Sequence, residues 1–270
     1  MKKILPILLI AAICFACNKD KSSGKQWLLH KVYQNNVLKL EYIYSADKKP
    51  QRRNNYNSIG GQSVFTGSRR YQYNANGLLE EVSNFNKDSV LTERYRLQYD
   101  LNKRLLRQDY YGNGNTIQYY DQFENDATGK LIRYTTFNAA SNKKMVEAQY
   151  SYDPQGHPVS IKRYTYSLNN LVLHDTASFT IEKDFPSWWS YYETWPAVAL
   201  PYEDQTFFEM TFTRSYFYLA NTPPVTSEAT YTNKIYNQEG LVIKQQVSTK
   251  IEGYGSPTVS VIEKTYEYTE

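Results

Sequence analysis

Cysteine is nearly absent from this sequence: only Cys14 and Cys17 occur in 270 residues. Both stand at the end of an apolar N-terminal run, so the rest of the chain has no thiol for a disulfide, a nucleophile or a zinc site. The three histidines, His30, His157 and His174, are far apart and form no H-x-x-H pair. The sequence therefore predicts no metal and no cofactor.

Catalytic motifs are also missing. No G-x-S-x-G, G-x-G-x-x-G or P-loop pattern occurs. The Gly-rich stretch Tyr111–Thr116 precedes no helical pattern, which a phosphate-binding loop would require. Asp100, Asp153 and Asp175 are isolated in the sequence, and Asp153 fits a turn. We expect a protein that is not an enzyme.

An excess of one charge is lacking as well. The chain has 31 basic and 27 acidic residues, interspersed, and a net charge of +4. Basic residues gather only in short pairs such as Arg52–Arg53 and Arg69–Arg70, whereas nucleic-acid-binding proteins show a basic patch or stripe. We therefore expect no nucleic-acid partner.

The one clear hydrophobic run is N-terminal. Lys2 and Lys3 precede an apolar run over 4–16, which has the length of a secretory signal and is too short to span a bilayer comfortably. It ends in Ala16 and Cys17, which resembles the lipobox of bacterial lipoproteins, although Cys14 stands where that family prefers Leu. An ordinary secretory signal with an incidental cysteine is the alternative.

The resemblance implies that residues 1–16 are removed as a signal peptide and that Cys17 is acylated, which would anchor the protein in a membrane. Residues 17–25 then form a polar, flexible tether. Because Asn18 is not the Asp that retains many lipoproteins at the inner membrane, we expect the outer membrane. The periplasmic or cell-surface side is left open.

Tyrosine is abundant, with 27 residues, and it recurs in a pattern of an aromatic strand followed by a turn. Tyr and Thr at such density favour strands, and regular self-similarity indicates a repeat architecture. The units are YIYSADKKPQRRNNY (42–56), YQYNANGLLEEVSNF (71–85), LQYDLNKRLLRQDYY (97–111), DQFENDATGKLIRYTTF (121–137), YSYDPQGHPVSIKRY (150–164), KIYNQEGLVIKQQVS (234–248) and the unfinished YEYTE (266–270).

Each unit predicts a β-hairpin. Tyr71 and Tyr73 alternate with a polar residue, so their rings leave the same face of a strand. Asn74 can bond to the backbone two residues on, and Gly77 supplies a positive φ three residues later. One hairpin alone is marginal in water, so neighbouring hairpins must bury their aromatic faces together.

The same turn pair recurs as Asp153 with Gly156 and as Asn237 with Gly240. Lys48 and Lys103 stand where glycine is expected, which predicts strained turns or turns of another type. From about 167 to 232 the pattern fades.

This repeat resembles the YD repeats of RHS-like proteins. It is also similar to small Gram-negative envelope lipoproteins of unknown function with a porin-like β fold. The resemblance implies an architecture and transfers no functional residue. We predict an all-β domain over 26–270, in which consecutive antiparallel hairpins form a curled sheet or an incomplete barrel. A membrane-spanning porin is not expected, because the second strands carry charges on both faces, as in Glu80–Glu81.

One segment breaks the repeat, at about 184–208, and it is rich in Trp and Pro. Clustered aromatic rings are typical of a glycan or protein contact surface, but rings in such number also favour burial, for example as a plug of an open sheet end. The candidate binding residues are Trp188, Trp189, Tyr192, Trp195, Tyr202, Glu203 and Asp204.

Three functions remain open. The first is a non-catalytic envelope lipoprotein that acts as a binding or scaffold module for a glycan or a partner protein. The second is a glycan hydrolase that relies on Glu203 and Asp204. The third is a structural repeat that pairs with another envelope protein along an unpaired sheet edge.

Overall fold

The computed structural model of the chain describes residues 28–154, 158–167, 170–181, 210–216, 225–253 and 256–270. These residues form sixteen β-strands. In chain order the strands are β1 (Leu28–Gln34), β2 (Val37–Tyr44), β3 (Pro50–Ile59), β4 (Gln62–Tyr73), β5 (Leu79–Asn86), β6 (Leu91–Tyr99), β7 (Leu105–Tyr111), β8 (Ile117–Asn125), β9 (Leu131–Asn138), β10 (Lys144–Tyr152), β11 (Pro158–Ser167), β12 (Asn170–Ile181), β13 (Met210–Tyr216), β14 (Val225–Tyr236), β15 (Val242–Glu252) and β16 (Thr258–Thr269).

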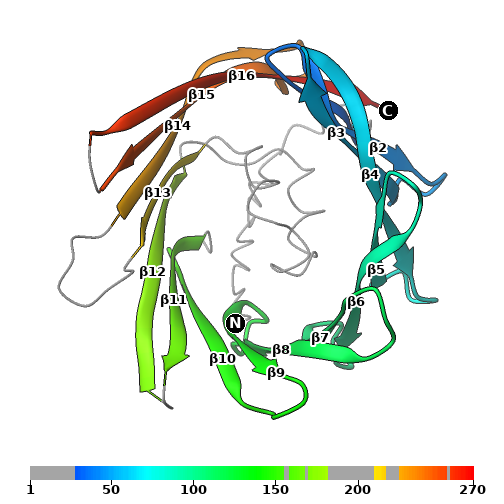
Figure 1. Cartoon of the computed structure of the whole chain (residues 1–270), viewed down its shortest axis with the longest axis vertical. Coiled ribbons are helices and arrows are strands. Elements are labelled where there is room, and N and C mark those ends of the chain that lie inside the picture. The colour runs from blue at the N-terminus through cyan, green and yellow to red at the C-terminus, as the bar shows by residue number, and fades with distance from the viewer. Residues whose placement is uncertain (1–27, 155–157, 168–169, 182–209, 217–224, 254–255) are drawn as a thin grey trace, which may run out of the picture.

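Every strand pairs antiparallel with its neighbours in the chain, so the predicted all-β series of hairpins is confirmed. The sheet curls further than the predicted incomplete barrel, because β1 pairs with β2 on one side and with β16 on the other, and the ring closes (Figure 1). Closure pairs Leu28 with Thr269 and Gln34 with Lys264. Where β1 pairs with Lys264–Thr269 of β16, the sheet therefore lacks the open edge that the third hypothesis requires.

The two faces of the sheet differ in burial. The face that carries Tyr71, Val82 and Leu97, here called the tyrosine face, holds most of the buried side chains. The opposite face, here called the charged face, has exposed residues such as Arg96 and Lys162. Side chains converge on the concave side of a closed sheet and diverge on the convex side. We therefore assign the tyrosine face to the concave side.

Hydrophobic clusters on the tyrosine face span adjacent strands. One contains Tyr71, Leu79, Val82 and Leu97, with partly buried tyrosines packed against it. A second forms where the ends of the chain meet, from Leu29, Val32, Tyr42 and Tyr266. Aromatic rings and branched aliphatic side chains buried between hairpins supply the apolar contact that a single hairpin lacks.

The two ends of the barrel differ too. At one end, here called the turn end, the chain turns through the repeat motif, as it does between Tyr73 and Leu79. At the other, here called the far end, the connections vary and include the Gly60–Gly61 turn between β3 and β4. The repeat therefore specifies one end of the barrel more than the other.

Candidate functional site

The residues that sequence analysis singled out for binding lie outside the described residues. This holds for Trp188, Trp189, Tyr192, Trp195, Tyr202, Glu203 and Asp204, for Cys17, and for the turn glycine Gly156. The candidate site is therefore built from the strands.

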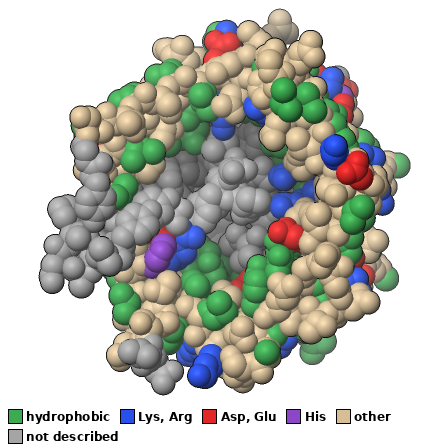
Figure 2. All heavy atoms as spheres, in the orientation of Figure 1, with side chains coloured by type: hydrophobic (Ala, Val, Ile, Leu, Met, Phe, Trp, Pro, Cys, Tyr) green, Lys and Arg blue, Asp and Glu red, His purple; other side chains and the backbone are tan. Residues whose placement is uncertain are grey.

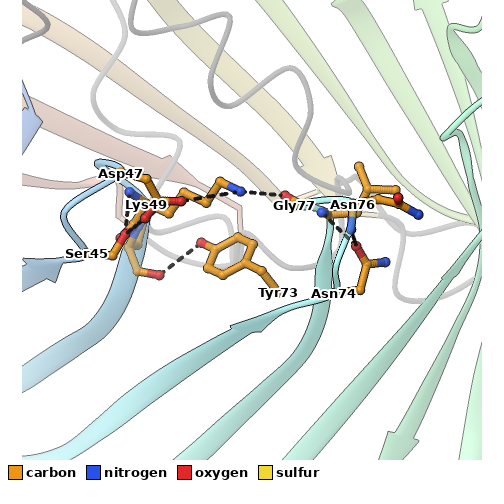
Figure 3. Close-up of polar contacts among 9 residues, drawn as sticks. Ser45, Asp47, Lys49, Tyr73, Asn74, Asn76 and Gly77 are labelled. Carbon is orange, nitrogen blue, oxygen red and sulfur yellow. Dashed lines mark hydrogen bonds and ion pairs between the residues drawn. The ribbon is translucent and has the colours of Figure 1, made fainter.

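The repeat turns share one hydrogen-bonding pattern. Asn74 Oδ1 accepts from the backbone N–H of Asn76 at 3.0 Å and of Leu78 at 3.1 Å, and Gly77 has φ +74° (Figure 3). Asn237 Oδ1 likewise accepts from Leu241 at 2.8 Å, and Gly240 has φ +78°. An Asx side chain and a left-handed glycine thus close both of these turns.

Of the two alternatives expected for the turns at Lys48 and Lys103, strain is confirmed and another turn type is wrong. Both turns have the same backbone bonds as the glycine turns, and the lysines adopt φ +61° and +64°. Their turns are of the same type, with a lysine in the left-handed region. The turn bonds, including those that Asp100 Oδ1 accepts from two backbone N–H groups at 2.8 Å, offset the left-handed strain of about 1–2 kcal/mol.

The second tyrosine of each repeat ties neighbouring hairpins together at the turn end. Tyr73 donates from its hydroxyl to the Pro50 carbonyl at 2.9 Å, and Tyr99 donates to the Leu79 carbonyl at 2.8 Å. The acceptor is in each case the first residue of the adjacent strand. The other pairs are Tyr44 with Leu29, Tyr152 with Leu131 and Tyr268 with Val242, and Asn125 replaces tyrosine in its bond to Leu105. These tyrosines are structural.

Lys49 strengthens the same end. Its Nζ reaches the Gly77 carbonyl of the next turn at 3.1 Å and lies 5.1 Å from the centre of the Tyr73 ring (Figure 3). A lysine that bridges two turns holds adjacent hairpins in register.

A polar band crosses the tyrosine face from β4 to β6, toward the far end. Arg69 Nε donates to Asn84 Oδ1 at 2.8 Å, and Asn84 Nδ2 donates to Glu93 Oε2 at 2.8 Å. Tyr95 donates from its hydroxyl to the same carboxylate oxygen at 3.2 Å. Each strand contributes one side chain, because Arg69, Asn84 and Glu93 stand in register. The band offers cationic, amide, carboxylate and hydroxyl groups side by side.

A stack of tyrosines continues the band onto β7 and β8. The rings of Tyr110 and Tyr119 are stacked, with centres 4.1 Å apart and planes at 12°. Tyr95 lies 5.1 Å from Tyr110 in a tilted arrangement. All three rings are half-buried, and burial raises the pKa of each phenol above its usual value. They are therefore neutral hydroxyl groups at ordinary pH.

Asp121 is the most unusual titratable group of the tyrosine face. It is 5% exposed, and Thr136 donates a hydroxyl bond to its Oδ1 at 2.5 Å. Burial raises the pKa of this carboxyl to about 6, against the smaller opposing effect of the Thr136 bond. Asp121 faces Gln108, which is 1% exposed, across β7 and β8.

Asp175 is not isolated in the fold, although it is so in the sequence. Arg163 contacts its Oδ1 through Nε and Nη2, each at 3.0 Å, and His174 Nδ1 lies 2.8 Å from its Oδ2. Asp175 is fully buried, and the guanidinium neutralises it. We assign this cluster a structural role, because the guanidinium of Arg163 on β11 and the imidazole of His174 on β12 both contact the same buried carboxylate.

The charged face carries arginines laid over aromatic rings. Arg107 lies 3.8 Å from the centre of the Tyr120 ring, and Arg94 lies 4.6 Å from that of Tyr111. Arg96 also donates to Glu81 Oε2 at 2.9 Å. Figure 2 shows basic and acidic side chains interspersed around the ring. This face differs from the continuous apolar band of strands that contact lipid.

Metal-binding clusters and membrane-spanning helices are both absent from the described residues. No group of three or more His, Cys, Asp or Glu residues suited to a metal ion occurs in the described ranges. Those ranges also hold no helix long and apolar enough to cross a membrane.

Comparison with known proteins supplies a fold and no family. No family model matches this chain, and no curated protein matches it. Its fold is similar to that of a porin-like protein from Bacteroides uniformis ATCC 8492, with a TM-score of 0.52 and 10% identity over 85% of this chain and 89% of that one.

Two further solved structures are less similar. A porin-like protein from Bacteroides vulgatus ATCC 8482 has a TM-score of 0.35 and 9% identity over 89% of this chain and 98% of that one. The Photorhabdus luminescens Tc holotoxin pore has a TM-score of 0.28 and 15% identity over 76% of this chain and 11% of that one. At these identities, only the fold of the Bacteroides uniformis protein bears on this chain.

Sequence reasoning missed the polar band and the tyrosine stack. Each strand contributes one side chain to each of these features, and the side chains become neighbours only through the register in which the strands pair. Arg69 was noted only as part of a basic pair and Tyr110 only as a residue of a repeat unit, whereas Tyr95 and Tyr119 lie outside the units. The available signal was the alternation along each strand, which puts the three tyrosines on one face once the register is known.

Proposed function

We propose that this chain is a non-catalytic envelope lipoprotein that binds a hydroxyl-rich ligand, of which a glycan is the best fit, on the tyrosine face of its barrel. The observation that carries the proposal is the continuity of the Arg69–Asn84–Glu93 band with the stack of Tyr95, Tyr110 and Tyr119. The likeness of the fold to a porin-like protein supports an envelope setting.

The chemistry of this site suits a sugar. Flat rings stack on the apolar faces of sugars, and paired donors and acceptors suit vicinal hydroxyl groups. Tyr110 and Tyr119 are half-buried, so their rings keep an accessible part. The hydroxyl bonds by which repeat tyrosines tie neighbouring hairpins together lie at the turn end, so they do not account for the stacking of Tyr110 on Tyr119.

The spacing of the carboxyl groups supports binding over hydrolysis. Glu93 and Asp121 stand two strands and four residues apart on the same face. That corresponds to about 16 Å, at about 4.8 Å between strands and 3.4 Å per residue. Glycosidase carboxyl pairs are roughly 5–10 Å apart. Glu203 and Asp204, on which the hydrolase hypothesis relies, lie outside the described residues.

Oligosaccharide binding to the purified full chain tests the ligand. Calorimetry with oligosaccharides of cellulose, xylan, starch and polygalacturonate should reveal at least one that binds. Tyr119→Ala should then weaken binding about 10–100-fold, because a stacking ring is lost. Phe137→Ala removes a half-buried ring from the charged face of the adjacent strand and should leave affinity unchanged. Failure of the whole panel, or equal losses in both variants, would overturn the proposal.

The anchor is tested separately. Cells that express the full chain are labelled with an alkyne palmitate analogue and fractionated. The wild type should carry label and sediment with outer membranes, whereas Cys17→Ala should be unlabelled and leave that fraction. An alanine variant that stays labelled and membrane-bound would contradict acylation at Cys17.

A further inference from the structure

Strand β16 is longer than the strand that closes the barrel against it. Pairing with β1 covers Lys264–Thr269, whereas pairing with β15 runs along Thr258–Thr265. The pairing of β16 with β1 stops at the β1–β2 turn. There the Asn35 N–H donates to the Glu263 carbonyl at 2.8 Å, and the Glu263 N–H donates to Asn35 Oδ1 at 2.9 Å. Among the described residues, no strand pairs with Thr258–Ile262 on that side. We call this stretch the free edge.

The free edge is exposed and apolar. Val259 is 62% exposed and Val261 is 59% exposed, and Thr258 and Ser260 are exposed as well. Its five residues, TVSVI, include four β-branched residues, which favour strands, and no charge or proline. Proteins usually guard an unpaired edge with Lys, Pro or a β-bulge. The register of β16 against β15 shows no bulge here.

Another overhang at the far end is better guarded. Gln62–Thr66 of β4 extends past β5, whose pairing begins at Gly67 with Asn86. That stretch has one strongly exposed aliphatic side chain, Val64, and the β3–β4 pairing is interrupted by a bulge next to it. Bulges twist an edge away from further pairing. The free edge of β16 therefore stands out.

We propose that the free edge pairs with the free edge of a second copy of this chain, antiparallel about a twofold axis at Ser260. Along a strand, the backbone N–H and C=O groups of every second residue point to the same side. Those of Glu263 point toward β1, where they bond to Asn35. The N–H and C=O groups of Val261 and Val259 therefore point to the same side, away from β15. In the pair, Val259 of one copy exchanges two hydrogen bonds with Val261 of the other. Thr258 faces Ile262, so every pair except that of the two Ser260 residues joins β-branched side chains.

The sequence of the free edge favours a second copy over another partner. TVSVI contains no charge with which to select an acidic or basic peptide, and it is self-complementary when reversed about Ser260. A twofold pair uses the same surface on both copies and closes after two. The dimer thus pairs the exposed backbone groups of the free edge on both copies.

Disulfide cross-linking of the full chain tests this geometry. Ser260 faces its own copy in a non-hydrogen-bonded pair, with Cα atoms about 4.5 Å apart, which is within disulfide range. Ser260→Cys should form a disulfide-linked dimer under mild oxidation of detergent-solubilised protein. Thr249→Cys lies directly opposite on β15, one strand inward, and its two copies would be about 14 Å apart. It should stay monomeric, as should the wild type, which controls for the native cysteines.

A charge variant sharpens the test. Val261→Lys in the Ser260→Cys background should reduce cross-linking at least roughly tenfold, because it puts a charge directly opposite apolar Val259 and brings two like charges onto a diagonal of the pair. Ser248→Lys, its neighbour on β15, should not. Unchanged thermal unfolding shows that both variants fold. A monomeric Ser260→Cys, equal cross-linking of Thr249→Cys, insensitivity to Val261→Lys, or a cross-link to a different protein would each overturn the proposal.

Discussion

The tyrosine face and the charged face of one sheet carry similar residue types but use them differently. On the tyrosine face, burial raises the pKa of Asp121 to about 6. On the charged face, the carboxyl of Glu267 has a lowered pKa, first because the Tyr33 hydroxyl donates to it. A carboxylate is thus costly on one face and stabilised on the other. The curvature of the sheet produces this difference, because it crowds one face and opens the other.

Truncation of aliphatic side chains should show the largest contrast between the faces. Leu97 is 5% exposed on the tyrosine face, and Ile43 is 41% exposed on the charged face, where it pairs with Arg52. We expect Leu97→Ala to lower the free energy of unfolding by about 2–5 kcal/mol, because it leaves a cavity, and Ile43→Ala to change it by less than about 1 kcal/mol. Urea unfolding measures both. Equal losses would erase the distinction between the faces.

The pH dependence of stability should reveal Asp121. Its folded-state pKa of about 6 lies above the usual 3.8, so the folded protein holds a proton that the unfolded chain has released. Stability from this group is therefore full below about pH 4 and is lost as the pH rises through about 6, by roughly 2–3 kcal/mol.

Asp121→Asn should remove this loss and leave a flatter profile from pH 4 to 7. Glu267→Gln is the control on the charged face, with the opposite sign: stability from Glu267 is present above its usual pKa and is lost as the pH falls. Urea midpoints at a series of pH values measure both. A wild-type protein that gains stability between pH 4 and 6 through Asp121 would contradict the assignment.

Tyrosine hydroxyls should separate the faces by a smaller amount. Tyr99 donates to the Leu79 carbonyl on the tyrosine face, whereas Tyr33 donates to exposed Glu267 at 2.7 Å on the charged face. Tyr99→Phe leaves a part-buried carbonyl without its bond and should cost about 1–2 kcal/mol. Tyr33→Phe should cost less than about 0.5 kcal/mol, because water replaces the phenol. Thermal unfolding compares the two, and a larger loss for Tyr33→Phe would reverse the ranking.

Ion pairs on the charged face should matter least. Arg96 and Glu81 meet at 2.9 Å, and the Arg96 side chain is half exposed. Arg96→Gln should lower stability by about 0.2–1 kcal/mol at low salt, because exposed pairs are screened. The loss should shrink in 1 M NaCl. A loss above 2 kcal/mol, unaffected by salt, would show that this face contributes more than surface pairing.

The hairpins follow from the sequence because the contacts that define them are local. An Asx residue and a left-handed residue three positions later lie within one turn, so Asn74 and Gly77 determine it by themselves. Lys48 and Lys103 were expected to strain the turn or to change its type, and they keep the type at a positive φ. The bonds from the first turn residue outweigh the modest strain of a lysine at positive φ.

Alternation along each strand also follows from the sequence, because successive side chains leave opposite faces. It places Tyr95 and Leu97 on one face of their strand, and Tyr71 and Tyr73 on one face of theirs, before any register is known. Closure does not follow in this way. It pairs Leu28 with Thr269, and contacts at such a distance along the chain depend on the summed twist and length of every strand between them.

The register of strand pairing also determines which side chains form the candidate site and which residues of β16 form the free edge. Arg69, Asn84 and Glu93 become neighbours only when three strands align, and a slip of one residue would send each to the other face. The free edge of β16 exists because β1 is shorter than its partner, a property of two strands compared and of neither alone. The sequence by itself thus determined the repeating hairpin and its two faces, through bonds within a few residues. The tertiary structure decided which side chains meet and which backbone groups remain unpaired, because those depend on pairing between distant segments.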